Sequence, residues 1–237
     1  MSKRPVAIFV VAHPDDVAFS MGGTAWLLKD EYQLHVVCAT RGERGYAWKG
    51  GGLPPANPEV ARIRSAEEHA SCALLGATLE FLDLDDGLII ASRDAVERVA
   101  AILSQHAPAM VFTHGPQDKP DHAAIAILTL QALYHATLTY ETDLYMACEH
   151  ASRQARSPDL FVDISPVIDA KRAQIACHQS HHQHPGSIES LISVNADLGC
   201  IAGCAHAEAF LLGLPLVDTR GNRDATPRLL RASRAVM

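Results

Sequence analysis

The chain has 237 residues, of which 48% are hydrophobic and 20% charged, and its formal net charge at pH 7 is −7. This balance is typical of a soluble globular protein, and an acidic chain without a basic block is not expected to bind nucleic acid. The first apolar run is too short for a signal peptide, and no run reaches the length of a membrane span, so we expect a cytoplasmic protein.

Predicted strands and helices alternate along the chain. A continuous apolar run at 6–12 is typical of a strand that is covered on both faces. Further strands are expected at 34–40, 79–84, 109–113, 143–148 and 159–164, and helices at 17–29, 58–75, 94–105, 123–135, 167–181 and 187–212. Gly76 is the expected C-terminal cap of the second helix. This alternation predicts a Rossmann-like, doubly wound, mostly parallel α/β sheet with helices on both faces.

We interpret residues 1–237 as a single domain with a core over about 6–212. The segment 213–237 has five arginines after Pro215 and is expected to form a C-terminal arm or surface tail. Six cysteines are scattered without a CxxC pair, so we expect ordinary thiols rather than a disulfide framework.

Polar side chains gather where four of the predicted strands end. His13 follows the first strand, the segment RGERG (41–45) the second, Asp85 and Asp86 the third, and the segment 114–122 the fourth. Open α/β sheets bind their ligands at the carboxyl ends of the strands. The coincidence of four such loops predicts a binding or catalytic site at this edge.

The first strand ends at the sequence His13-Pro14-Asp15-Asp16. One aspartate can serve as a helix N-cap, but a cap explains neither the second acid nor His13. A metal ion explains all three side chains, because His13 and Asp16 can converge on one ion while Asp15 stays beside it as a free carboxylate. Two adjacent carboxylates are then tolerable, since the cation offsets their repulsion.

A catalytic zinc normally takes three protein ligands and keeps one position open for water. The third ligand must therefore come from another loop. His122, which follows Pro120 and Asp121 after the fourth strand, is the best candidate. His114, earlier in the same loop, is its competitor.

Seven short motifs in chain order resemble one known family. They are AHPDD with GGT (12–16 and 22–24), TRGERG (40–45), RSAEE followed by LLG (64–68 and 74–76), DDG (85–87), PDH (120–122), KRAQIACHQS (171–180) and AEAF (207–210). The family is that of the LmbE-like, or PIG-L, zinc-dependent N-deacetylases, which act on N-acetylglucosamine conjugates and related compounds. The resemblance implies one zinc per chain on His13, Asp16 and His122, with Asp15 as the general base, and relatives are often homo-oligomers.

Elementary chemistry supports the same roles. Zinc lowers the pKa of a bound water to about 7, and a neighbouring carboxylate such as Asp15 can take the proton. The same carboxylate can then return a proton to the leaving amine, which is a very poor leaving group as an anion.

The chain departs from its apparent relatives at two places. Lys119 stands where many relatives carry a histidine, and its charge could stabilise an oxyanion, although a solvated loop charge is the simpler interpretation. The segment 178–181 reads HQSH where many relatives read HxSQ. The histidine-rich tract 178–184 could form a second metal site. We favour the interpretation that His178 binds substrate near the pocket and that the other histidines of the tract are exposed.

Three further residues are candidates for substrate binding. Arg64 shares a helix face with Glu67, and this spacing alone fits a surface ion pair. The resemblance instead implies that Arg64 points into the pocket. Glu43 could cap or line the same site, and Asp86 is either a turn residue or an acceptor for a sugar hydroxyl.

We therefore expect a zinc-dependent hydrolase that removes an N-acetyl or other N-acyl group from an amino-sugar conjugate. A thiol-conjugate amidase of the same family and a non-catalytic metal-holding protein are the alternatives. A purely binding site would need His13, Asp16 and His122 but no free Asp15. A nucleotide-binding Rossmann domain is disfavoured, because no GxGxxG or GxxxxGK motif is present.

Overall fold

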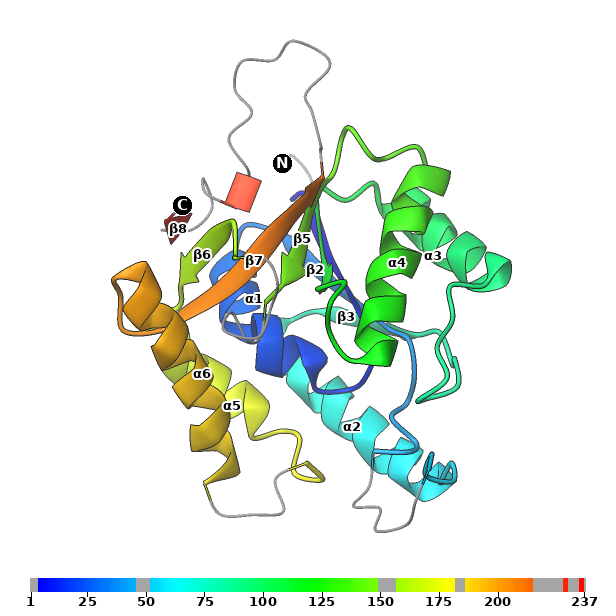
Figure 1. The fold of residues 1–237 in the computed structure, drawn as a ribbon, viewed down its shortest axis with the longest axis horizontal. Coiled ribbons are helices and arrows are strands. Elements are labelled where there is room, and N and C mark those ends of the chain that lie inside the picture. The colour runs from blue at the N-terminus through cyan, green and yellow to red at the C-terminus, as the bar shows by residue number, and fades with distance from the viewer. Residues whose placement is uncertain are drawn as a thin grey trace.

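The structure is a computed structural model that describes residues 4–45, 52–148, 157–181, 186–214, 228–229 and 235–236. Within these residues, eight strands form one sheet in the order β3-β2-β1-β4-β5-β7-β6-β8 (Figure 1). The strands are β1 (Val6–Val11), β2 (Gln33–Cys38), β3 (Thr78–Phe81), β4 (Met110–His114), β5 (Asp143–Ala147), β6 (Leu160–Asp163), β7 (Ala207–Leu214) and β8 (Ala235–Val236).

The first five strands pair in parallel, whereas β7 runs antiparallel between β5 and β6. The order β3-β2-β1-β4-β5 is that of a doubly wound sheet. The predicted Rossmann-like, mostly parallel α/β fold is confirmed.

The main helices are α1 (Gly22–Leu28), α2 (Pro58–Leu75), α3 (Arg93–His106), α4 (Pro120–His135), α5 (Ile168–Ile175) and α6 (Ser187–Ala202). A π-helical turn at Val17–Met21 leads into α1. Asn57 caps the start of α2 by accepting the N–H of Glu59, and Gly76 ends this helix at φ 65° as predicted.

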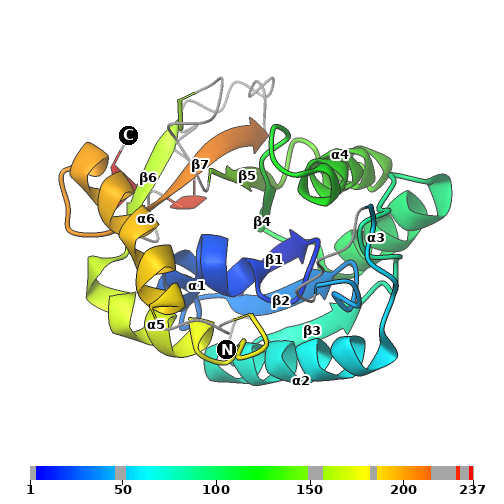
Figure 2. The same ribbon diagram turned by 60° about the horizontal axis from the view of Figure 1, so that its bottom comes forward.

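Helices cover both faces of the sheet. Alternate side chains of β1 enter different cores: Ile8 and Val10 pack with residues of α3, α4 and α6, whereas Phe9 and Val11 pack with residues of α1 and α2. Figure 2 shows α3 and α4 on one side of the sheet and α1, α2 and α5 on the other. None of the helices in the described ranges combines the length and hydropathy that a membrane crossing requires.

The predicted helix at 187–212 was wrong in its second half. The helix α6 ends at Ala202, because Gly203 adopts a left-handed conformation at φ 77° and its N–H bonds to the carbonyl of Gly199. The apolar run that follows forms β7, which pairs with strands on both sides. The predicted helix at 167–181 is also shorter, since α5 ends at Ile175.

A buried ion pair joins the two last motifs of the resemblance. The Lys171 Nζ lies 2.6 Å from Glu208 Oε1, and the Glu208 carboxylate accepts the backbone N–H groups of Gly23 and Thr24, both at 2.8 Å. These N–H groups belong to the first turn of α1, where helix donors need acceptors. The pair therefore holds α1 against β7.

Parts of the predicted C-terminal arm pack on the sheet. The backbone of Ala235–Val236 pairs with β6, Leu229 is buried, and Arg228 Nη1 lies 2.7 Å from Asp143 Oδ1. The remainder of 215–237 lies outside the described residues.

The strand order reverses at β1, which has β2 on one side and β4 on the other. Loops that leave β1 and β4 therefore depart in different directions and enclose a crevice. The first loop carries His13 and Asp16, and the second leads to His122.

Candidate metal centre and active-site cavity

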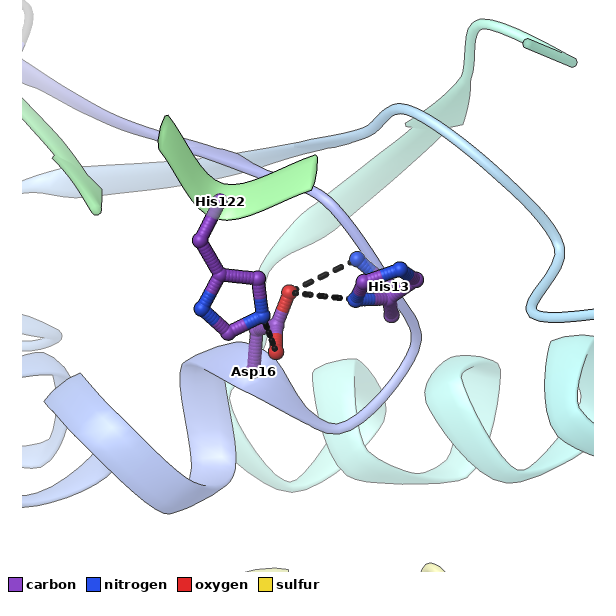
Figure 3. Close-up of side chains that lie close together, drawn as sticks. All are labelled: His13, Asp16 and His122. Carbon is purple, nitrogen blue, oxygen red and sulfur yellow. Dashed lines mark hydrogen bonds and ion pairs between the residues drawn. The ribbon is translucent and has the colours of Figure 1, made fainter. Parts of the chain in front are cut away.

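Three predicted ligands come together at the crevice. His122 Nε2 lies 3.3 Å from Asp16 Oδ1, and His13 Nδ1 lies 3.6 Å from Asp16 Oδ2 (Figure 3). One possible ligand atom from each of the three residues lies within 4.8 Å of those of the other two. His13 and Asp16 come from the turn after β1, and His122 from the first turn of α4. These residues can therefore hold one metal ion.

Carboxylates contact the outer ring nitrogens of both histidines. His13 Nε2 lies 3.2 Å from Asp121 Oδ2 and 3.1 Å from Asp86 Oδ1. His122 Nδ1 lies 2.9 Å from Asp118 Oδ2. Carboxylates at this position fix the orientation and tautomer of metal-binding histidines. His13 is thus oriented to present Nδ1, and His122 to present Nε2, toward Asp16.

The sequence interpretation did not assign Asp118 or Asp121 to this role. The spacing of Asp118 and His122, four residues apart at a helix start, was the available signal. Nothing in the sequence indicated that Asp121 would contact His13, because the two residues are 108 positions apart.

His114, the competing ligand, lies behind the cluster at the end of β4. Its Nε2 lies 3.0 Å from Asp16 Oδ2 and accepts the backbone N–H of Ala12 at 3.2 Å. Its buried ring stacks on that of His122 with a centroid distance of 3.8 Å. His114 Nε2 is contacted by both the Ala12 N–H and Asp16, whereas His122 has its Nδ1 held by Asp118 and presents Nε2 to Asp16, so we keep His122 as the proposed third ligand.

The donor set suits a divalent transition metal. Two imidazole nitrogens and one carboxylate are typical ligands of zinc, and they also allow iron, cobalt or nickel. Burial raises the pKa of Asp16, but His122 and His114 outweigh burial and hold that pKa well below the ordinary value. Asp16 therefore offers an ionised carboxylate to the candidate centre.

Asp15 occupies a strained turn beside the cluster. Its φ of 105° is unusual for a residue with a side chain. The strained backbone is held by α2: the Asp15 N–H donates to Glu68 Oε2 at 3.1 Å, and Arg64 Nη2 donates to the carbonyl of Pro14 at 2.7 Å. Strain of this kind persists only where surrounding contacts enforce it, and it gathers at functional sites.

The Asp15 carboxylate is buried but charged. Its Oδ2 accepts from Arg64 Nη2 at 2.8 Å and lies 3.2 Å from His181 Nδ1. Burial raises the pKa of Asp15, but the Arg64 guanidinium and His181 outweigh burial and hold that pKa below the ordinary value. The group therefore stands ionised beside the candidate metal centre at neutral pH.

A cavity of about 520 Å³ opens onto these residues. The polar lining includes the three candidate ligands together with Asp15, Arg64 and Asp86. The lining also includes apolar side chains, namely Leu191, Val194 and Leu198 of α6 together with Phe19. Lys119 lies exposed at the rim. The cavity can thus take a molecule with both polar and apolar groups.

Only some of the predicted substrate-binding residues line the cavity. Arg64 and Asp86 line the cavity, as does the predicted catalytic residue Lys119. Glu43 holds the neighbouring loop, because its Oε1 accepts the backbone N–H of Asp86 at 2.8 Å. His178 is buried behind the wall, where Nε2 lies 3.6 Å from Glu68 Oε2.

His181, which the sequence interpretation placed among the exposed histidines, lines the cavity. Its side chain is 53% exposed, so His181 both lines the cavity and reaches solvent. Residues 182–185 lie outside the described residues, and with them the last three residues of the tract 178–184 that raised a second metal site.

A family model described as PIG-L, GlcNAc-PI de-N-acetylase, matches residues 8–133, more than half of the chain. The chain belongs to the PIG-L family. The matched region includes the turn after β1, all of α2 and the start of α4, and thus each member of the candidate metal centre.

Some relatives of this PIG-L protein are named as deacetylases, and one is named as a hydratase. A 4-oxalmesaconate hydratase of Pseudomonas putida is 31% identical over 187 residues, which are 72% of this chain and 72% of the relative. A probable N-acetyl-alpha-D-glucosaminyl L-malate deacetylase 2 of Bacillus cereus is 26% identical over 196 residues, covering 76% of this chain and 84% of the relative. The N,N'-diacetylchitobiose deacetylase of Pyrococcus horikoshii shares the fold, with a TM-score of 0.75 and 24% identity over 89% of this chain and 84% of that one.

Proposed function

We propose that this protein is a zinc-dependent N-deacetylase that removes an N-acetyl or other N-acyl group from an amino-sugar conjugate, such as an N-acetylglucosamine derivative. In this proposal His13, Asp16 and His122 hold one zinc ion. The single observation that carries it is the position of Asp15: a buried carboxylate held at φ 105° that lines the same cavity as the three candidate ligands. A site that only stored a metal would have no use for this strained acid.

A divalent ion bound by these ligands would polarise the amide carbonyl and make a water molecule more acidic. Asp15 accepts the proton of that water, so that the water oxygen attacks the carbonyl carbon. Arg64 keeps Asp15 ionised before this step through the contact of 2.8 Å between the two side chains. We assign to Lys119, which lines the rim of the cavity, the positive charge that stabilises the oxyanion.

A second candidate function is hydration of a carbon–carbon double bond, since the hydratase of Pseudomonas putida is 31% identical. That chemistry also needs an activated water. An unsaturated acid, however, would need unpaired cations in the cavity. Of the cations in the lining, Arg64 is paired with Asp15 and Arg44 Nη2 lies 2.7 Å from Asp85 Oδ1, so only the exposed Lys119 among these three would serve such an acid. The apolar residues that α6 adds to the lining also suit an acyl group better than a polycarboxylate, so we favour deacetylation.

The test is a comparison of two reactions with the zinc-loaded protein. Free amine is measured with a panel of N-acetylated amino-sugar conjugates, and loss of ultraviolet absorbance is measured with conjugated unsaturated acids. We expect amine release that a chelator abolishes and added zinc restores. Hydration of the acids without any amine release would contradict the proposal and support the hydratase.

A further inference from the structure

One face of the helix α6 lines the cavity with apolar side chains. Leu191, Val194 and Leu198 all belong to the lining, and their spacing of three and four residues places them on the same side of the helix. Leu198 is buried, whereas Leu191 and Val194 are half-buried and keep part of their surface accessible. An apolar group that covered them would remove this surface from water, which is favourable.

The polar side chains of α6 do not offset this apolar character. Asn195 also lines the cavity, but it is 4% exposed and its Nδ2 donates to the carbonyl of Ala207 in β7 at 3.0 Å. The two acids of the helix, Glu189 and Asp197, are exposed and are not among the residues that line the cavity. The helix therefore presents an uncharged, largely apolar face to the cavity.

The protein itself fixes the position of this face. Ile192 of α6 belongs to one buried cluster with Ala18 of the π-helical turn and Ile175 of α5. Arg172 Nη2 lies 3.0 Å from Glu189 Oε2 and joins α5 to the first turn of α6. A surface that is already in place can bind an apolar group without the cost of ordering the helix first.

The size and polar groups of the cavity also indicate a partly apolar ligand. Its volume of about 520 Å³ lies in the range of pockets that enclose drug-sized molecules and exceeds what an acetyl group alone requires. Buried charges of the lining serve the protein: Arg64 pairs with Asp15, and Glu208 pairs with Lys171 and accepts two backbone N–H groups. A ligand that is polar throughout would need further partners for each hydroxyl that leaves water.

We propose that the apolar face of α6, formed by Leu191, Val194 and Leu198, binds an alkyl chain of the substrate. The substrate class is then an amino-sugar conjugate that carries such a chain. This inference rests on the proposed deacetylation and concerns the same cavity. The chain is either the N-acyl group or the aglycone of the sugar, since both present the same methylene groups to the helix. Binding is stabilised in proportion to the apolar area that the chain and the helix remove from water.

The test is amine release by the zinc-loaded protein from two series of compounds. In the first series glucosamine carries N-acyl chains from acetyl to decanoyl, and in the second N-acetylglucosamine carries glycosidic alkyl chains from methyl to octyl. We expect kcat/KM to rise about two- to fourfold for each added methylene in one of the two series, as burial of methylenes predicts. The series that shows the rise identifies the source of the chain.

Variants of the helix show whether α6 causes the rise. Leu191→Asn and Val194→Thr keep the approximate size of the side chain but make the face polar, so each should flatten the dependence of kcat/KM on chain length. Ile201→Asn is the matched control, because Ile201 is a 65% exposed residue of α6 outside the cavity lining, and it should keep the wild-type slope. Zinc content is measured on every sample. If Leu191→Asn does not fold, Val194→Thr decides.

Two results would overturn the inference while leaving the proposed function intact. One is amine release whose kcat/KM does not rise with chain length in either series. The other is a rise that persists unchanged in Leu191→Asn and Val194→Thr, because the chain then lies elsewhere in the cavity. Release of amine from no compound of either series would overturn the proposed function, and this inference with it.

Discussion

Asp121 directly precedes the candidate ligand His122 in the sequence, but its carboxylate contacts the other histidine of the centre, His13, with 3.2 Å between Oδ2 and Nε2. The same carboxylate accepts the backbone N–H groups of Gly87 at 2.7 Å and Ile89 at 3.3 Å. One side chain thus connects the loops after β1, β3 and β4. Each loop carries part of the site, so Asp121 fixes their relative positions.

Replacing Asp121 should therefore weaken metal binding without removing a ligand. We expect Asp121→Asn to lower zinc affinity about 10- to 100-fold, the usual cost of losing a carboxylate that orients a metal-binding histidine. Competition with a chromophoric chelator measures the affinity. Asp94→Asn, an exposed acid in the first turn of α3, is the control and should leave it unchanged. Equal affinities of the two variants would refute the orienting role.

The choice between His122 and His114 as third ligand gives a second prediction. His122→Ala should abolish stoichiometric zinc binding, because the site is left with two ligands. His114→Ala should retain the metal, since His114 serves the backbone N–H of Ala12. Metal content after gel filtration decides the matter. If His122→Ala kept the metal and His114→Ala lost it, the two assignments would have to be exchanged.

The loops that form the site could be foreseen because each follows a recognisable apolar strand. The run before His13 and the run before the Pro120-Asp121-His122 turn predicted strands of one mostly parallel sheet, and the rule for open sheets placed their carboxyl ends at the same edge. That the two strands are neighbours is shown by the structure. Sequence spacing contains no information on which carboxylate faces which imidazole nitrogen. The roles of Asp118 and Asp121 depend on side-chain directions that only packing decides.

Two errors have identifiable physical causes. The apolar content of the run after Ala202 is compatible with either a helix or a strand. The left-handed conformation of Gly203 ends α6, and the run forms β7 instead. The second error is the predicted helix at 167–181, because α5 ends at Ile175. His178 and His181 therefore lie on a loop, where one contacts Glu68 and the other Asp15. Helical spacing therefore did not apply to them.

Lys119 gives a third prediction. Its positive charge at the rim should stabilise the oxyanion without touching the metal. We expect Lys119→Ala to lower turnover by up to about a hundredfold while zinc affinity stays constant. The measurement is kcat for amine release together with a zinc titration. An unchanged kcat would return Lys119 to the role of a solvated loop charge.

His35 gives a prediction for the pH dependence of stability, far from the candidate metal centre. This histidine lies in β2 and stacks on His106 with a centroid distance of 4.7 Å. Burial, together with His106, lowers the pKa of His35 to about 4. Between this value and the ordinary pKa of about 6.5, the unfolded chain binds more protons than the folded one. Stability should therefore rise with pH over this window and be lost as the pH falls through it.

The variant His35→Gln removes this titration. The urea midpoint of the metal-free protein should depend less steeply on pH between about 4 and 6.5 in this variant than in the wild type. His135→Gln, an exposed histidine at the end of α4, should keep the wild-type slope. A slope that is the same in all three proteins would contradict the account of His35.

The most direct test of the proposed mechanism is zinc content and amine release measured on the same samples of Asp15→Asn and Asp16→Asn. Asparagine keeps the size of aspartate but cannot accept the proton of a water. Asp15→Asn should retain zinc and lose turnover about a hundredfold or more, as expected for a general base, whereas Asp16→Asn should lose zinc affinity first. Full activity of Asp15→Asn, or loss of zinc from Asp15→Asn with retention in Asp16→Asn, would contradict the account.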